Sequence, residues 1–266
     1  MTAIAIAGAA GRMGKAIIRF LPDFEDLRLA AAIENAGHPE LGRDAGEAAG
    51  IGKLDVKITE DIDTVVHSDV LIDFSFHEAT VVNVEAAAAH RRAVVIGTTG
   101  LTAAEGGRVA RAADKVPIVW APNMSIGMNL LFAAVRKAAE VLGNDYRRSI
   151  DETHHVHKKD APSGTALRFG EILAETRGRE LRDLMVQDPE DPADRELADK
   201  IVICSHREGE VVGDHTVAFE NPMERIEFTH RARTRDTFAR GALFAARWVC
   251  TRKPRLYDMQ DVLGLR

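Results

Sequence analysis

A short apolar run leads into three glycines near the start of the chain, Ile4-Ala5-Ile6-Ala7-Gly8-Ala9-Ala10-Gly11-Arg12-Met13-Gly14. The run predicts a β-strand, and the residues after it predict a tight turn followed by a helix. Glycines in such a turn let the backbone approach a pyrophosphate, and the helix start offers unpaired N–H groups to it. The spacing G-x-x-G-x-x-G is a variant of the dinucleotide fingerprint G-x-G-x-x-G.

An acidic residue, Glu34, ends the next apolar run, Leu29–Ile33. In dinucleotide-binding domains an acidic group about 20 residues after the glycines binds the hydroxyls of the adenosine ribose. The alternative is a solvated carboxylate at a strand end. The glycine loop upstream favours the ribose interpretation.

Short apolar runs alternate with helical patterns through the first half of the chain. Strands are expected at Ala3–Ala7, Leu29–Ile33, Val56–Ile58, Val70–Phe74, Ala93–Ile96 and Pro117–Trp120, and helices near Gly11–Phe20, Glu78–His90 and Thr102–Ala113. This alternation predicts an α/β domain with a Rossmann-type parallel sheet covered on both faces. Its strands end at one edge, where Gly97-Thr98-Thr99-Gly100 and Ala121-Pro122-Asn123-Met124-Ser125 join the glycine loop. Three loops at one edge suit an extended dinucleotide.

The pattern changes after about residue 125. Helices are expected at Ile126–Leu142, from Gly164 and at Asp236–Thr251, and a His- and Lys-rich loop is expected after Gly143. Antiparallel strands are expected at Lys200–His206, Glu210–Phe219 and Arg225–Arg233. Residues 188–199 are expected to form an exposed loop. We therefore expect a dinucleotide-binding domain over 1–125 and an α+β domain with a mixed or antiparallel sheet over 126–235. Spacing alone does not decide where the last helix packs.

Bulk composition narrows the class of protein. The chain has 266 residues, 45% of them hydrophobic, and a net charge of −6, which is typical of a globular protein. No basic domain indicates nucleic-acid binding, and no apolar run approaches the ~20 residues of a membrane-spanning helix. The two cysteines, Cys204 and Cys250, lie far apart, which favours packing roles in a reducing compartment such as the cytoplasm.

Titratable side chains are most concentrated in one segment, Asp151-Glu152-Thr153-His154-His155-Val156-His157-Lys158-Lys159-Asp160-Ala161-Pro162-Ser163-Gly164-Thr165. Charge runs are usually solvated, but clustered histidines indicate a titrating or anion-binding site. The segment leads into a helix start, which adds N–H donors for an anion. A small dicarboxylate is the expected ligand. Zinc fits poorly, because His-His-x-His lacks the usual ligand spacing.

Three segments resemble 4-hydroxy-tetrahydrodipicolinate reductase, the family formerly called dihydrodipicolinate reductase. They are Gly8–Gly14, Gly97–Gly100 and, above all, Glu152–Ala166, and the closing Tyr257–Leu263 is also similar. The resemblance covers essentially the whole chain. It implies a cytoplasmic enzyme of lysine and diaminopimelate biosynthesis that reduces a cyclic, unsaturated dicarboxylic imine with NADH or NADPH.

The resemblance also implies roles for individual residues. His154 and Lys158 would be the catalytic pair, with Lys158 as the proton donor, and His155, Gly164 and Thr165 would bind the substrate. The cofactor would contact Gly8, Ala9, Ala10, Gly11, Arg12, Met13, Glu34, Gly97, Thr98, Thr99, Ala121, Pro122, Asn123 and Met124. No metal is expected. The C-terminal helix, 236–266, would complete the first domain, and the second domain would build a homotetramer through its sheet.

One departure from the family pattern concerns the cofactor. Members that use NADPH often carry Arg just after the ribose carboxylate, whereas this chain has Asn35. A 2′-phosphate would lack a fixed cation there, apart from Arg12, and Glu34 would repel it. We therefore expect NADH to be used at least as well as NADPH.

Two other functions fit parts of the sequence. A different two-domain reductase is one, but the semialdehyde type needs a nucleophilic cysteine, and neither Cys204 nor Cys250 has that setting. The other is a non-enzymatic sensor of dinucleotide and dicarboxylate, which would need no proton donor. Turnover by a Lys158→Ala variant discriminates between a sensor and an enzyme.

Overall fold

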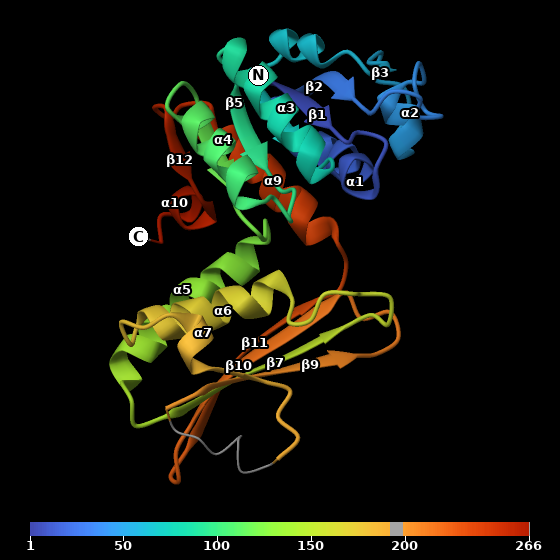
Figure 1. The fold of residues 1–266 in the computed structure, drawn as a ribbon. Coiled ribbons are helices and arrows are strands. Elements are labelled where there is room, and N and C mark those ends of the chain that lie inside the picture. Colours follow the sequence, from blue (N-terminus) through green and yellow to red (C-terminus); the bar gives the residue numbers. More distant parts are fainter. Residues whose placement is uncertain (192–198, 266) are drawn as a thin grey trace. The chain divides into compact units, whose positions relative to one another are not determined.

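The computed structural model describes residues 1–191 and 199–265, and Figure 1 shows its ribbon. Two compact units make up the chain: Met1–Ile126 with Arg235–Arg266, and Gly127–Thr234. Residues 192–198, part of the loop expected over 188–199, lie outside the described residues. Among the described helices, none combines the length and hydropathy needed to cross a membrane.

The first unit is built on a seven-stranded sheet with the strand order β12-β6-β5-β4-β1-β2-β3. Its strands are β1 (Thr2–Ala7), β2 (Leu27–Ile33), β3 (Ile58–Thr59), β4 (Val70–Asp73), β5 (Ala93–Ile96), β6 (Pro117–Trp120) and β12 (Arg255–Tyr257). All pairings between these strands are parallel, which confirms the expected α/β class. The direction in which strands are added reverses between β1 and β4, the place where open parallel sheets bind ligands.

Helices cover both faces of this sheet. They are α1 (Arg12–Phe20), α2 (Ala45–Ala49), α3 (His77–Ala89), α4 (Ala103–Ala113), α9 (Asp236–Val249) and α10 (Met259–Leu263), with the 3-10 turns η1 (Leu21–Asp23) and η2 (Ile62–His67). Side chains of β1 alternate between two cores: Ile4 and Ile6 pack with α1 and α9, whereas Ala5 and Ala7 pack with α3 and α4. Because successive strand residues point to opposite faces, β1 lies in the middle of three layers.

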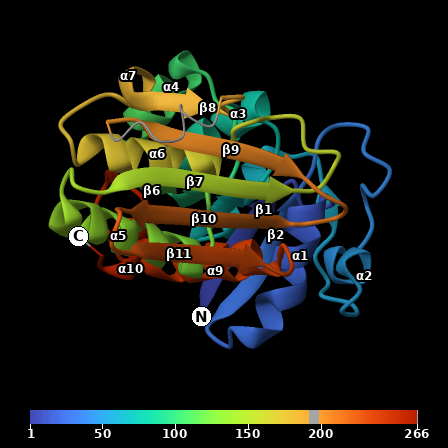
Figure 2. The ribbon, with the colours of Figure 1, turned by 90° about the horizontal axis from the view of Figure 1, so that it is seen from below.

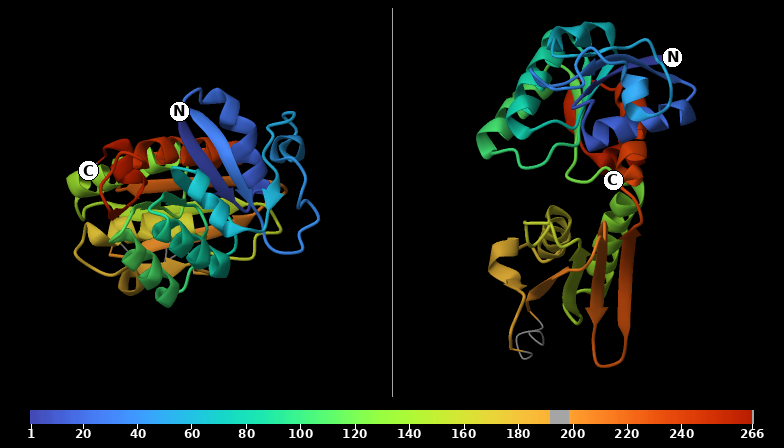
Figure 3. Two further views of the ribbon diagram at one scale, coloured as in Figure 1. Left: turned by 90° about the horizontal axis from the view of Figure 1, so that it is seen from above. Right: turned by 90° about the vertical axis from the view of Figure 1, so that its right-hand side faces the viewer.

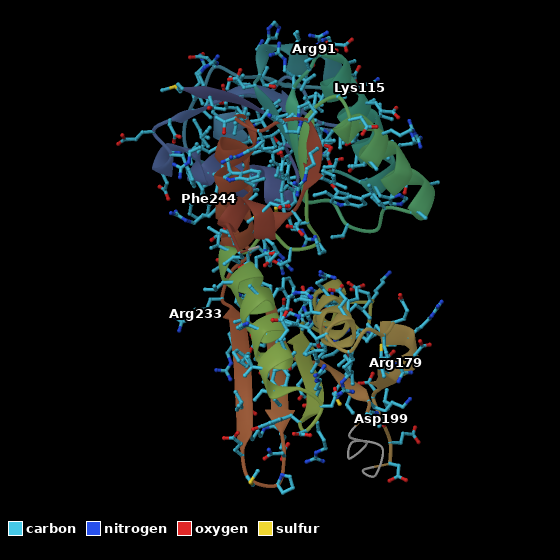
Figure 4. The ribbon with its side chains drawn as sticks, turned by 90° about the vertical axis from the view of Figure 1, so that its left-hand side faces the viewer. Arg91, Lys115, Arg179, Asp199, Arg233 and Phe244 are labelled. Carbon is cyan, nitrogen blue, oxygen red and sulfur yellow. The ribbon has the colours of Figure 1, made fainter. Side chains whose placement is uncertain are left out.

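The C-terminal helix α9, red in Figure 3, packs against α1, which is blue. Phe244, labelled on it in Figure 4, packs against the core that contains Ile4 and Ile6. A Cβ atom on Gly241 would lie 1.8 Å from the carbonyl oxygen of Met124, so this position of α9 accepts only glycine. The Thr237 hydroxyl also donates to the Ser125 hydroxyl at 3.1 Å. The two places where the chain leaves the first unit are therefore tied together.

The second unit contains a five-stranded sheet with the order β11-β10-β7-β9-β8, seen face-on in Figure 2. Its elements are α5 (Ile126–Leu142), β7 (Arg147–His154), α6 (Gly164–Glu175), α7 (Leu181–Leu184), β8 (Met185–Gln187), β9 (Ile201–Arg207), β10 (Gly213–Glu220) and β11 (Arg225–Ala232). Phe132 of α5, Phe169 of α6 and Phe219 of β10 share one core between helices and sheet. The sheet is mixed, because β10 is antiparallel to β7 and β11 whereas β9 is parallel to β7 and β8.

Three expectations about strands were wrong. The strand β9 was expected to be antiparallel, and both of its pairings are parallel. The His- and Lys-rich loop expected after Gly143 is confirmed only over 155–163, because Arg147–His154 form a strand at the centre of the sheet. In the first unit β3 covers Ile58–Thr59 and not Val56–Ile58, because the Val56 N–H donates to the Asp44 carboxylate instead.

The central strand β7 escaped prediction because its buried face is polar. Arg148, Ile150, Glu152 and His154 alternate along that face, and only Ile150 is apolar. The Arg148 guanidinium reaches the last turns of two helices, where it donates to the carbonyl oxygens of Gly143 and Leu173, each at 2.7 Å. Burial lowers the pKa of Arg148 to about 10, and it remains charged near neutral pH, a cation placed at two helix C-termini.

Candidate functional site

The glycine loop has a backbone that other residues cannot adopt. Gly8 has φ +76°, and a Cβ atom there would lie 2.5 Å from the carbonyl oxygen of Phe74. A Cβ atom on Gly14 would lie 2.1 Å from the carbonyl oxygen of Gly8. Gly11 caps α1 without any side-chain hydrogen bond, so the first N–H groups of that helix have no side-chain cap. The loop therefore packs tightly against β4 and α1 and presents backbone donors, as anion-binding loops do.

A pocket of about 710 Å³ opens beside this loop. Its lining includes Gly8, Gly11, Glu34, Asn35, Glu60 and Phe76. The pocket lies at the ends of β1, β2 and β4, where the strand order reverses. Its volume falls within the usual range for small-molecule sites.

The Glu34 carboxylate is held by the loop that it faces. Its Oε2 accepts a hydrogen bond from the Ala10 N–H at 3.0 Å, and its Oε1 accepts one from the Asn35 N–H at 3.0 Å. The backbone N–H of Glu34 donates to the carbonyl oxygen of Thr59 at 2.9 Å. These bonds fix the carboxylate at the pocket wall. Glu60, which follows β3, adds a second negative charge to the lining that sequence reasoning missed.

Of the residues expected to bind the cofactor, Gly8, Gly11 and Glu34 line this pocket. Within the glycine loop Ala9 and Ala10 are buried, whereas Arg12 is exposed and Met13 half-buried at the start of α1. Residues 97–99 and 121–124, all described, are not among the residues that line the pocket. A Cβ atom on Gly97 would lie 2.1 Å from the Phe74 ring, so this second loop reaches the first through Phe74. Met124 lies under α9.

A buried carboxylate that the sequence did not reveal, Asp73, connects these loops. Its oxygens accept hydrogen bonds from the hydroxyls of Thr80 and Thr98, each at 2.7 Å, and from the Asn83 amide at 2.7 Å. The Ser75 hydroxyl donates to it at 2.9 Å. Asp73 therefore joins the end of β4 to α3 and to the loop after β5. Its only signal in the sequence is an acidic residue at the end of an apolar run.

The second unit gathers a group of buried polar side chains at the end of β7. Glu152 is 0% exposed, and its Oε1 accepts hydrogen bonds from the Ser163 N–H and the Ser205 hydroxyl, both at 2.9 Å. Its Oε2 lies 3.5 Å from Nδ1 of His154 and 3.6 Å from Nε2 of His215. We call Glu152, His154 and His215 the carboxylate–imidazole cluster. Sequence reasoning found only His154 among them.

Burial and charge set the protonation states in this cluster. Burial raises the pKa of Glu152, but the neighbouring His215 imidazole and the hydrogen bond from Ser163 outweigh it and hold that pKa at about 2. Burial, followed by the nearby His215, lowers the pKa of His154 to about 4. The cluster therefore contains an ionised carboxylate and a neutral His154 near pH 7. The ligand atoms of its three members lie within 4.8 Å of one another, near enough together for one metal ion.

Between β7 and α6 runs the rest of the His and Lys segment. The Lys158 ammonium donates to both oxygens of Asp160, at 2.9 and 2.8 Å. Nδ1 of His155 is buried and has no hydrogen-bond partner among the described residues. The segment ends at Ser163, whose hydroxyl caps α6 by accepting from the Ala166 N–H. Because the Ser163 N–H also donates to Glu152, the cluster holds the start of α6 in place.

The expected catalytic and substrate-binding residues thus occupy one end of the second unit. His154 ends β7, Lys158 and His155 lie in the loop, and Gly164 and Thr165 form the first turn of α6. Gly164 is exposed and Thr165 half-buried. Cations and helix N–H groups near one another can bind a small dianion and deliver a proton to it.

Comparisons with known proteins identify the family. The model of the dihydrodipicolinate reductase N-terminus matches residues 2–124, and the model of the C-terminus of the same enzyme matches residues 127–263. The 4-hydroxy-tetrahydrodipicolinate reductase of Syntrophotalea carbinolica is 47% identical over 267 residues, covering 100% of both chains. The reductase of the same name from Geotalea daltonii is 46% identical, again over 100% of both.

A solved structure has the same fold. Dipicolinate-bound dihydrodipicolinate reductase from Paenisporosarcina sp. TG-14 matches with a TM-score of 0.76 and 23% identity, over 97% of each chain. An amine dehydrogenase from Mycobacterium smegmatis matches less closely, with a TM-score of 0.58 and 12% identity over 96% of this chain and 93% of the other. With two family models over nearly all of its length and relatives almost half identical to it, the chain belongs to the dihydrodipicolinate reductase family of NAD(P)H-dependent oxidoreductases.

Proposed function

We propose that this enzyme converts 4-hydroxy-tetrahydrodipicolinate to tetrahydrodipicolinate in lysine biosynthesis. The 4-hydroxyl group leaves as water, and a hydride and one proton add to the unsaturated imine that results. Relatives named for this activity match the chain from end to end. The observation that carries the proposal is the loop after β7, where the Lys158 ammonium, the His155 imidazole and the first turn of α6 combine a cation with polar groups and helix N–H donors. To bind and reduce a dicarboxylic imine, an enzyme needs hydrogen-bond donors for the carboxylates and an acid that donates a proton to the ring system when hydride is added.

The substrate residues then have distinct roles. His155, Gly164 and Thr165 bind a substrate carboxylate, because backbone N–H groups at a helix start favour anions. Lys158 donates the proton that accompanies hydride addition, and His154 assists it. The carboxylate of Asp160 accepts hydrogen bonds from the Lys158 ammonium, so a substrate carboxylate competes with Asp160 for this cation.

The nicotinamide cofactor supplies the hydride. In the proposed binding mode, the loop formed by Gly8, Ala9, Ala10, Gly11, Arg12 and Met13 holds its pyrophosphate. Glu34 accepts hydrogen bonds from the adenosine ribose, a role that its existing bond from Ala10 supports by fixing the carboxylate. Gly97, Thr98 and Thr99, with Ala121, Pro122, Asn123 and Met124, lie on the nicotinamide side. The reaction requires the nicotinamide and the bound substrate to meet, with water excluded.

The cofactor preference follows from charge at the pocket of the first unit. Asn35 offers no cation, and Glu34 and Glu60 both line the pocket. A 2′-phosphate would face two carboxylates there. We expect kcat/KM with NADH to equal or exceed that with NADPH. A ten-fold preference for NADPH, worth ~1.4 kcal/mol, would refute this.

We also propose a cytoplasmic homotetramer built through the sheet of the second unit. Helices α5 and α6 cover one face of that sheet, and charged side chains such as Arg147, Glu220 and Arg225 form ion pairs on the other. The two cysteines form no disulfide, which fits a reducing compartment. Sedimentation equilibrium tests the assembly, and a monomer at micromolar concentration contradicts it.

One assay tests the reaction itself. Substrate is generated in place from pyruvate and aspartate semialdehyde by the condensing enzyme, and oxidation of the reduced nicotinamide is followed by absorbance. Oxidation should begin only when both precursors and the condensing enzyme are present. If the reduced cofactor stays unoxidised while substrate accumulates, the proposed function is wrong.

A further inference from the structure

The carboxylate of Glu152 lies where two imidazole rings converge, and no step of the proposed reaction uses it. An ionised carboxylate offers about four acceptor positions. The Ser163 N–H and the Ser205 hydroxyl occupy those of Oε1, both at 2.9 Å. Oε2 is buried and has no hydrogen-bond partner among the described residues. A buried acceptor destabilises the folded chain unless a donor faces it, so the groups around Oε2 decide its role.

Two imidazole nitrogens are the donors nearest to Oε2. Nδ1 of His154 lies 3.5 Å away and Nε2 of His215 lies 3.6 Å away. Nδ1 of His154 is itself buried and has no other partner in the described chain. A proton on this nitrogen therefore satisfies two buried atoms at once, whereas a proton on Nε2 would leave two lone pairs facing each other.

The charges around His154 favour the same proton position. Glu152 is the negative group beside the ring, whereas His215, Lys158 and Arg207 disfavour a positive charge on it. Burial also favours the neutral ring, which carries one proton. That proton is drawn to the nitrogen that faces the carboxylate, because the interaction with the anion is strongest there.

On its other side the His154 ring faces Gly213, the first residue of β10. A Cβ atom on Gly213 would lie 3.0 Å from Nε2 of His154. Glycine at this position therefore lets the strand pack closely against the ring, where a larger side chain would displace it. Nδ1 is the ring nitrogen enclosed by the cluster, and Nε2 points away from Glu152 toward the start of β10.

We infer that Glu152 is a positioning residue: its buried carboxylate holds His154 in the tautomer protonated at Nδ1, so that Nε2 acts as a hydrogen-bond acceptor in the substrate site. The inference rests on the proposed function for its catalytic consequence. In that reaction His154 accepts a hydrogen bond at Nε2, from the Lys158 ammonium or from substrate. Lys158 is then the proton donor, and His154 orients it.

The tautomer can be measured in the wild-type enzyme without any assay of activity. Long-range 1H–15N correlation spectra distinguish a protonated from an unprotonated ring nitrogen, and a His154→Asn spectrum assigns the signals. Near pH 7 the spectrum should show Nδ1 of His154 protonated and Nε2 unprotonated. The reverse pattern, or a doubly protonated ring, overturns the inference. This experiment stands even if the proposed substrate is wrong.

A pair of variants of the cluster tests the catalytic consequence. Glu152→Gln keeps the size of the side chain but places an amide beside Nδ1, so kcat should fall by about ten-fold or more, as when the carboxylate behind a catalytic imidazole is lost. Ser205→Ala removes a hydrogen bond from the same carboxylate, on Oε1, the oxygen that faces away from His154. Its kcat should stay within about two-fold, because the imidazole contact is intact.

Controls separate positioning from loss of structure. The Kd for NADH should be unchanged in both variants, because the cofactor is proposed to bind the other unit. If Ser205→Ala loses as much kcat as Glu152→Gln, the carboxylate is only structural and the inference fails. A metal gives a different result: if Zn²⁺ or Mn²⁺ activates the wild type and Glu152→Gln abolishes that activation, the cluster holds an ion and the inference also fails. An inactive wild type with the expected tautomer refutes the proposed function alone.

Discussion

Two central strands of this enzyme bury opposite kinds of side chain. Ile4 and Ile6 on one face of β1, and Ala5 and Ala7 on the other, are all aliphatic, at 1% exposure or less. On β7 the buried face carries the polar side chains Arg148, Glu152 and His154. The pocket of the first unit therefore lies at the ends of aliphatic strands, whereas the polar cluster of the second unit begins within the sheet itself.

The largest effect should come from Lys158→Ala. A positioned proton donor contributes about 10²–10⁴-fold, so kcat should fall by that factor. The Kd for NADH, measured by fluorescence titration, should not change, because the two ligands depend on different strands. Lys159→Ala, at an exposed neighbouring position, should retain kcat. If Lys158→Ala also lost affinity for NADH by a similar factor, the cofactor and the substrate would not depend on separate units.

Next comes Arg148→Met, which removes the cation at the ends of α5 and α6. The carbonyl oxygens of Leu173 and Gly143 each lose a charged donor, so the free energy of unfolding should fall by about 2–4 kcal/mol. On β1, Ile6→Val should cost only about 0.5–1.5 kcal/mol. Urea denaturation measures both, and hydrogen exchange should place the Arg148 effect in α5 and α6. Equal costs would show that the polar face of β7 is dispensable.

Gly8→Ala tests the backbone chemistry of the first unit. Positive φ together with a 2.5 Å approach to Phe74 should displace the loop, weakening NADH binding about ten-fold, ~1.4 kcal/mol. Gly37→Ala is the matched control, because Gly37 has φ +78° but no atom within 4 Å of a Cβ. Backbone strain should lower the free energy of unfolding of this variant, whereas its Kd for NADH should change little. Comparable Kd values for the two variants would contradict the role of close packing.

Acid should weaken the second unit first. His154 has a pKa lowered from 6.5 to about 4 in the folded chain, so the unfolded state binds more protons between these values. Its contribution to stability is complete above pH 6.5 and is lost as the pH falls toward 4, by about 3 kcal/mol. Glu152, lowered from 4.5 to about 2, adds a loss below pH 4.5.

A pH series of urea denaturation experiments checks this. The wild type should lose stability between pH 6.5 and 4 more steeply than His154→Asn, whose side chain does not titrate. Parallel curves for the two proteins would mean that the pKa of His154 is the same in the folded and the unfolded chain.

The same contrast explains what the sequence could predict. The fold of the first unit could be predicted from aliphatic runs and glycine spacing, because both are regular patterns in the sequence. Glu34 was identified because it follows such a run. The strand β7 was missed because Arg148, Glu152 and His154 replace the apolar residues that mark a buried face. His215 acquires its significance from Glu152, about 60 residues earlier in the chain, and Asp73 from α3 and from Thr98 in the loop after β5. A single sequence does not reveal such pairs.

The bond between Thr237 and Ser125 has a consequence for engineering. It brings the entry and the exit of residues 127–234 to the same point on the first unit, as in a domain inserted into a surface loop. A short glycine–serine linker from 126 to 235 would therefore close the first unit into a continuous chain. The glycine at 241 should be kept in such a protein, because it lets the returning helix seat against Met124.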